Sequence, residues 1–232
     1  MLPSLQPLQK RLDDLGRTLD NLGIDKPIYV TEFGVKLKDL KKGQREPAGT
    51  GGGHGLEFSA DTAFQHAWFM ALAPQYGVTG LVKWALYRTD APAHWGEWGM
   101  IDAPNANDAK PPRASFGRSH TYKVTRFLNQ LVERKSKPDG FGRSTDGTIL
   151  ASKFSSAANE SVILLNRGAQ TQQVALDGLK PNTEYFAADW NRDGHGGAAE
   201  KLPNVASKPG GTPVTVPRNG IVGLSTRDFF QP

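Results

Sequence analysis

The chain has 232 residues, 38% of them hydrophobic and 22% charged, which is the balance of a soluble globular protein with one large domain or two small ones. The formal net charge is +5, and the densest basic stretch, residues 36–46, also contains Asp39 and Glu46, so we expect no nucleic-acid partner. There are no cysteines for disulfides or thiolate metal sites, and the longest apolar run, residues 67–73, is too short to predict a membrane partner.

The first 135 residues alternate helix and strand patterns. Leucines recur every three or four residues over 4–22, which predicts a helix that Gly23 ends, and residues 28–31 predict a buried parallel strand. A helix over 59–73, a strand over 80–86 and a helix over 121–132 follow. The inward face predicted for the second helix consists of Phe64, Ala67, Trp68 and Ala71.

Two connections are unusually long, and both follow strands. Residues 35–58 include a glycine run with His54, and residues 87–113 include Trp95, Glu97 and Trp98. Long loops on one rim only are typical of the functional face of an α/β barrel. The alternative for the glycine run is a flexible lid or linker that contacts no ligand.

The pattern changes near residues 134–140, where helical periodicity ends. Short strand-like runs separated by turn signals then predict an antiparallel β-sandwich. The expected fold class is therefore α/β plus all-β, with a partial barrel domain at 1–135, a linker at 136–142 and a β-sandwich accessory domain at 143–232. The predicted strands of the sandwich are 148–154, 161–165, 172–176, 183–189, 213–216 and 220–224.

Glu32 comes directly at the carboxyl end of the first predicted strand, residues 28–31, and Gly34 follows it closely. Ligands and catalytic groups lie at the carboxyl ends of strands in parallel α/β sheets, so Glu32 is the first catalytic candidate. The alternative is a solvated glutamate at the start of a loop.

The stretch Tyr29-Val30-Thr31-Glu32-Phe33-Gly34, the strand ending in Trp84 and the later sandwich together resemble clan A glycoside hydrolases, the retaining (β/α)8-barrel enzymes of cellulase and β-xylosidase type. The resemblance covers nearly the whole chain. Further motifs in the same order as in the clan are Trp98-Gly99-Met100-Ile101-Asp102, Lys110-Pro111 and Tyr122.

The resemblance implies that Glu32 is the nucleophile on the seventh barrel strand and that Trp84, on the eighth, forms the floor of a sugar subsite. It implies a carbohydrate substrate and no required cofactor. Sugar rings stack on flat aromatic side chains, although Trp84 could instead fill the barrel core. The substrate-binding candidates are His54, Trp84, Trp95, Glu97 and Trp98.

The second carboxyl group of such an enzyme has no clear counterpart. In the clan it follows an asparagine on the fourth strand, but the Asn159-Glu160 pair lies in the predicted β-domain. Glu97 or Asp90 could reach a site near Glu32 from the neighbouring loop, although nothing in the clan assigns them this role. We therefore expect a C-terminal portion of a longer enzyme, inactive alone, whose partner is the missing N-terminal part of the barrel. No secretory signal is visible from Met1, and a chain without cysteines fits both the cytoplasm and an exported protein, so the compartment stays open. A secreted or periplasmic parent protein is one expectation.

Two other interpretations stay open. The chain could be a non-catalytic carbohydrate-binding or structural module. Residues 189–200 also place oxygen-bearing side chains as a calcium-binding loop does, although a glycine-rich hairpin turn uses the same residue types and is favoured. The possible calcium ligands are Asp189, Asn191, Asp193 and Glu200.

Overall fold

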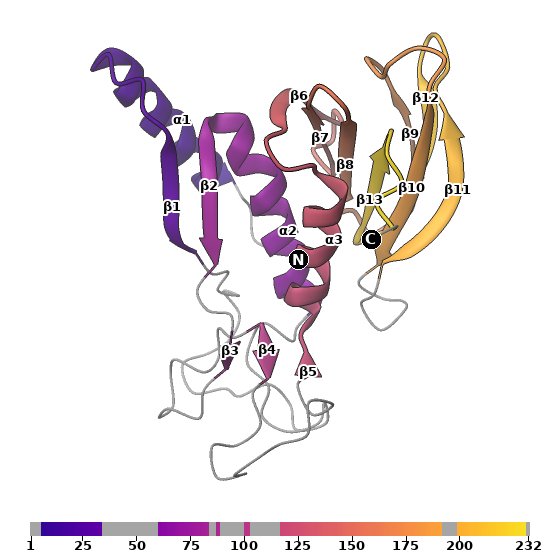
Figure 1. Cartoon of the computed structure of the whole chain (residues 1–232), viewed down its shortest axis with the longest axis horizontal. Helices are drawn as coiled ribbons and strands as arrows, with labels where there is room; N and C mark the ends of the chain where they lie inside the picture. The colour runs from indigo at the N-terminus through magenta and orange to yellow at the C-terminus, as the bar shows by residue number, and fades with distance from the viewer. Residues whose placement is uncertain are drawn as a thin grey trace. The chain divides into compact units, whose positions relative to one another are not determined.

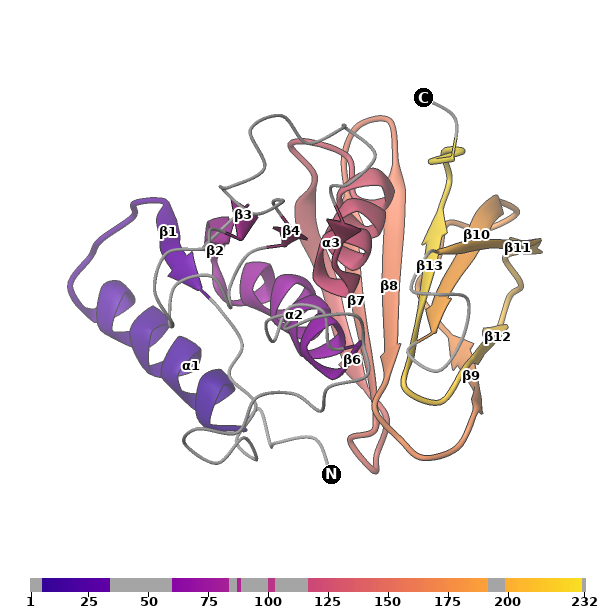
Figure 2. The same cartoon turned by 90° about the horizontal axis from the view of Figure 1, so that it is seen from below.

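The computed structural model describes residues 6–33, 60–83, 87–88, 100–102, 117–191 and 199–230. Contacts divide the chain into two compact units, Met1–Tyr122 and Lys123–Pro232, called the first and second unit below. Figures 1 and 2 show the elements of each unit from two directions. No helix in the described part of the chain is long and apolar enough to cross a membrane.

The first unit contains a parallel β-α-β arrangement. Helix α1 (Gln6–Asn21) precedes strand β1 (Ile28–Phe33), and helix α2 (Ala60–Leu72) with a short 3-10 turn (Ala73–Tyr76) leads to strand β2 (Val78–Lys83). Strands β1 and β2 pair in parallel. Gly77 adopts a left-handed φ of 84°, which lets the chain turn from the 3-10 segment into β2. The predicted order of helices and strands is confirmed.

Helix α2 is an interior helix. The four residues of its predicted inward face are buried, as expected, but so are Thr62, Gln65 and His66 on its other sides. One side of the helix contributes Phe69 to an apolar cluster with Leu12 of α1 and Val78 of β2. Helices buried all round lack a clear polar face, so the helical period alone understates how much of α2 is covered.

A small three-stranded sheet also belongs to the first unit, and the sequence patterns did not predict it. It consists of β3 (Tyr87–Arg88), β4 (Ile101–Asp102) and β5 (Gly117–Arg118), with β4 parallel to β3 and antiparallel to β5. Ser119 follows β5, and its Oγ accepts a hydrogen bond from the backbone N–H of Tyr122 at 3.0 Å, which caps helix α3 (His120–Leu131). Two-residue strands carry too little periodicity to be recognised.

The second unit consists of the remainder of α3 and two antiparallel sheets. One sheet has six strands in the order β11-β10-β13-β8-β7-β6, and the other has two, β12-β9. Both sheets contribute to one apolar core, which contains Leu164 and Val222 from the large sheet and Val214 and Val216 from the small one. The bounds are β6 (Lys137–Arg143), β7 (Ile149–Ser155), β8 (Glu160–Asn166), β9 (Gln172–Leu176), β10 (Glu184–Asn191), β11 (Glu200–Ala206), β12 (Thr212–Val216) and β13 (Gly220–Ser225).

All six strands predicted for this unit are present, and no end differs from the prediction by more than two residues. Two further strands, β6 and β11, form the two edges of the large sheet. Edge strands pair on one side only, so their sequences are less constrained than those of the strands between them.

Strand β6 lies where the sequence suggested a linker at 136–142. Pro138, Gly140 and Gly142 are turn signals, but an edge strand tolerates proline and glycine because one side of its backbone needs no partner. Strand β11 carries Pro203 for the same reason. The division between the two units by contacts, at Tyr122 and Lys123, falls inside α3.

Candidate active site

The carboxyl ends of β1 and β2 lie at the same edge of their sheet, because the strands are parallel neighbours. Phe33, the last residue of β1, pairs with Lys83, the last residue of β2. Glu32 is the next-to-last residue of β1. Trp84 follows Lys83 in the chain and lies outside the described residues. The backbone thus brings the strand end that carries Glu32 beside the strand end that precedes Trp84.

The pairing of β1 with β2 is irregular where Glu32 lies. Two residues of β1 stand opposite one residue of β2 between the pairs Val30/Leu81 and Phe33/Lys83. This count defines a β-bulge, a feature that is common next to active sites because it redirects the side chains of a strand. Glu32 is one of the two residues in this irregular segment.

The bulge also changes which residue faces the helices. Ile28, Val30 and Phe33 all pack against the apolar cluster between the strands and the helices of the first unit. Successive side chains of a regular strand point to opposite faces, so a regular continuation after Val30 would bring position 32 into this cluster. Phe33 packs there, so an aromatic ring continues the apolar layer at the end of the strand.

Phe33 is held by aromatic contacts with α2. Its ring stacks on the imidazole of His66 with centroids 4.9 Å apart and an interplanar angle of 20°, and it lies 4.9 Å from the ring of Phe69 at 51°. His66 is 1% exposed. Burial, reinforced by the positive charge of Lys83, lowers the pKa of His66 to about 3, so the imidazole is neutral at physiological pH.

The other predicted substrate-binding residues, His54, Trp84, Trp95, Glu97 and Trp98, lie outside the described residues and stay predictions, as does Asp90. The motif that follows Trp98 is partly described. Met100 is buried and its carbonyl accepts a hydrogen bond from the backbone N–H of Ser119 at 2.9 Å, while Ile101 and Asp102 form β4.

The Asn159-Glu160 pair belongs to the second unit, where internal hydrogen bonds hold it. The buried side chain of Asn159 donates to Ser161 Oγ at 2.8 Å and accepts from Ser225 Oγ at 2.9 Å. Glu160 accepts a hydrogen bond from the hydroxyl of Tyr185. These contacts give the pair a structural role in joining β8 to its neighbours.

The possible calcium loop connects two antiparallel strands. Asp189 of β10 pairs directly with Glu200 of β11, and residues 192–198, which include Asp193, lie outside the described residues. No group of three or more histidine, aspartate or glutamate side chains placed to hold a metal occurs in the described ranges. Strands on both sides of the loop differ from the helices that flank an EF-hand.

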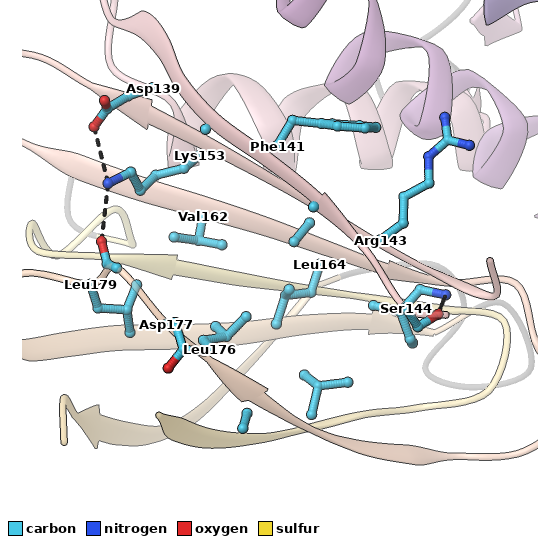
Figure 3. A pocket seen from close by; sticks show the side chains of 17 residues that line it. Asp139, Phe141, Arg143, Ser144, Lys153, Val162, Leu164, Leu176, Asp177 and Leu179 are labelled. Atoms are coloured by element: carbon cyan, nitrogen blue, oxygen red, sulfur yellow. Dashed lines mark hydrogen bonds and ion pairs between the residues drawn. The ribbon is translucent and has the colours of Figure 1, made fainter. Parts of the chain in front are cut away.

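The second unit also contains a groove of about 440 Å³ between the large sheet and β9 (Figure 3). Aliphatic side chains such as Val162, Leu164 and Leu176 line it. At one end Lys153 Nζ lies 3.1 Å from Asp139 Oδ2 and donates a hydrogen bond to the carbonyl of Gly178 at 3.0 Å. None of the predicted site residues lines this groove.

Sequence reasoning missed Phe33 and His66 as parts of the candidate site. Phe33 stands within the motif that carries Glu32, and His66 stands within an apolar helix among residues that pack in the core. The only signal is the imidazole of His66, which follows Gln65 and precedes an apolar run, and by itself it indicates neither a site nor a contact with Phe33.

Comparisons with known proteins identify a fold. No protein-family profile and no curated protein matches the chain. Among solved structures, it is similar to the glycoside hydrolase family 30 subfamily 8 xylanase from Clostridium acetobutylicum, with a TM-score of 0.59 and 10% identity over 88% of this chain and 43% of that one.

Two further structures show the same likeness. The catalytic domain of the family 30 xylanase C from Talaromyces cellulolyticus has a TM-score of 0.62 and 10% identity over 87% of this chain and 41% of that one. A family 44 endoglucanase from Clostridium acetobutylium has a TM-score of 0.57 and 10% identity over 92% of this chain and 35% of that one. The chain therefore has a glycoside hydrolase-like fold and spans less than half the length of these structures.

Proposed function

We propose that this chain is the C-terminal portion of a retaining glycoside hydrolase that cleaves β-linked polysaccharides or oligosaccharides, with Glu32 as the nucleophile. The observation that carries the proposal is the position of Glu32, in a bulge at the carboxyl end of a parallel strand, beside the end of β2. The glycoside hydrolase-like fold supports it. In this proposal β1 and β2 are barrel strands seven and eight, and the second unit is a β-sandwich.

The proposed chemistry needs two carboxyl groups and no cofactor. The carboxylate of Glu32 attacks the anomeric carbon and forms a glycosyl-enzyme ester, while a second carboxyl group about 5 Å away protonates the departing oxygen. The second group then removes a proton from water, which hydrolyses the ester and restores Glu32. We assign this acid/base to barrel segments outside the 232 residues, so the chain alone is inactive.

The first unit exposes a sheet face that fits these additional segments. Tyr29 is 59% exposed and Val82 is 54% exposed, on the face of the sheet opposite the helices. A Cβ atom at Gly80 would lie 2.7 Å from Cδ1 of Tyr29, so the ring lies over this glycine. Parallel sheets are usually covered on both faces, and further βα units of a barrel would cover this one.

The experiment is covalent labelling, with an activated 2-fluoro-sugar, of the full-length enzyme of which we propose this chain to be the C-terminal portion. Mass spectrometry should locate the label on Glu32, and a label on any other residue contradicts the assignment. Glu32→Gln separates the enzyme from the alternative, a non-catalytic carbohydrate-binding module. An enzyme loses turnover and keeps glycan binding, whereas a binding module changes little.

A further inference from the structure

The irregular segment of β1 requires something to hold it. A bulge leaves one residue without a regular partner in the ladder, so its geometry depends on contacts outside the sheet. Here the register between β1 and β2 shifts after Ile28 and shifts back before Phe33, so the irregularity is confined to the strand interior. Phe33 is the first residue after it that pairs normally again.

The contacts that fix Phe33 come from α2. The ring stacks on His66 and also contacts Phe69, three residues further along the same helix. His66 cannot move easily, because it is 1% exposed and lies in a helix that is buried on nearly all sides. A rotation of Phe33 out of this layer would release the constraint on the two residues before it.

We propose that His66 is a positioning residue: through its stack with Phe33 it fixes the bulge in β1 that carries Glu32. The inference rests on the proposed function, since it assigns the stack a role in presenting the nucleophile. Because burial keeps the imidazole neutral, the contact with Phe33 is a stack of two uncharged rings, and a phenyl ring can make the same stack.

The test compares three variants in the protein used for the labelling experiment. His66→Leu removes the stack, and His66→Phe restores an aromatic ring. Phe64→Leu is the matched control, because Phe64 is equally buried in α2 but lies two residues from His66, on the opposite side of the helix. The measurements are amide hydrogen exchange at residues 31–33, and the rate constant and the sugar dissociation constant for labelling of Glu32.

We expect faster exchange at residues 31–33 in His66→Leu and a labelling rate constant reduced about tenfold or more, with the sugar dissociation constant unchanged. His66→Phe should restore both values, and Phe64→Leu should change neither. Exchange in His66→Leu equal to wild type overturns the proposal, and so does faster exchange without slower labelling. Where wild type is not labelled at Glu32, the proposed function fails, and the exchange measurement alone decides whether the stack holds the bulge.

Discussion

The hydroxyl of Tyr185 in β10 donates a hydrogen bond to Oε1 of Glu160 in β8, and both side chains are buried. The same carboxylate accepts a hydrogen bond from the backbone N–H of Lys180 at 3.2 Å and lies 3.7 Å from Lys153 Nζ. Burial and the bond to Glu160 raise the pKa of Tyr185, so the phenol stays protonated as a donor. Glu160 is therefore held as a structural carboxylate.

Tyr185→Phe should lower the free energy of unfolding of the second unit by about 1.5–3 kcal/mol, because a buried carboxylate loses its hydroxyl donor. Urea denaturation monitored by circular dichroism measures the change. Glu184→Gln, at an exposed position of the same strand, should alter it by less than about 0.5 kcal/mol. Equal stability of Tyr185→Phe and wild type would contradict the structural role.

Gly223 allows α3 to pack closely on β13. A Cβ atom at this position would lie 2.7 Å from Cδ2 of Leu131 and 2.9 Å from Cζ of Phe127, and both side chains are buried. Gly223→Ala should therefore destabilise the second unit by about 1–3 kcal/mol, as measured by thermal or urea unfolding.

Gly142→Ala in β6 is the matched control with the opposite expected sign. The nearest atom to a Cβ there is Cβ of Ala151, at 3.9 Å, which is an ordinary contact. Replacing a strand glycine by alanine where there is room should stabilise the unit by about 0.5 kcal/mol. A destabilisation as large as that of Gly223→Ala would show that steric space is not what distinguishes the two positions.

The residues that could be predicted from the sequence are those with a repeated pattern. The helix over 6–21 repeats leucine every three or four residues, the six predicted strands of the second unit are short runs between turn signals, and all of these elements are present. The bulge at Glu32 could not be predicted, because it depends on the pairing of β1 with a strand that lies about fifty residues away in the chain. The stack of Phe33 on His66 depends in the same way on the packing of β1 against α2. Strand β6 could not be recognised because its proline and glycines are turn signals.

The exposed apolar residues of the first unit should make the isolated chain self-associate. Tyr29 and Val82 lie on the open sheet face, and Leu15, Leu22 and Ile24 are also exposed. Replacing Tyr29 and Val82 together by threonine, which keeps strand propensity, should reduce association in sedimentation velocity. Phe230→Thr, at an exposed position of the second unit, should not. A wild-type chain that is monomeric and unfolds cooperatively would contradict this prediction.

The stability of the first unit should decrease as the pH falls, because of His66. Its pKa is about 3 in the folded state and about 6.5 in an unfolded chain, so below pH 6.5 the unfolded state binds a proton that the folded state does not. The contribution of His66 to the free energy of unfolding is complete above about pH 6.5. It is lost as the pH falls toward 3, by at most about 1.4 kcal/mol for each pH unit. His66→Phe cannot take up this proton, so its free energy of unfolding, measured by urea denaturation between about pH 4 and 7, should depend less on pH than that of wild type. Identical pH dependence of the two proteins would show that His66 is accessible to protons in the folded state.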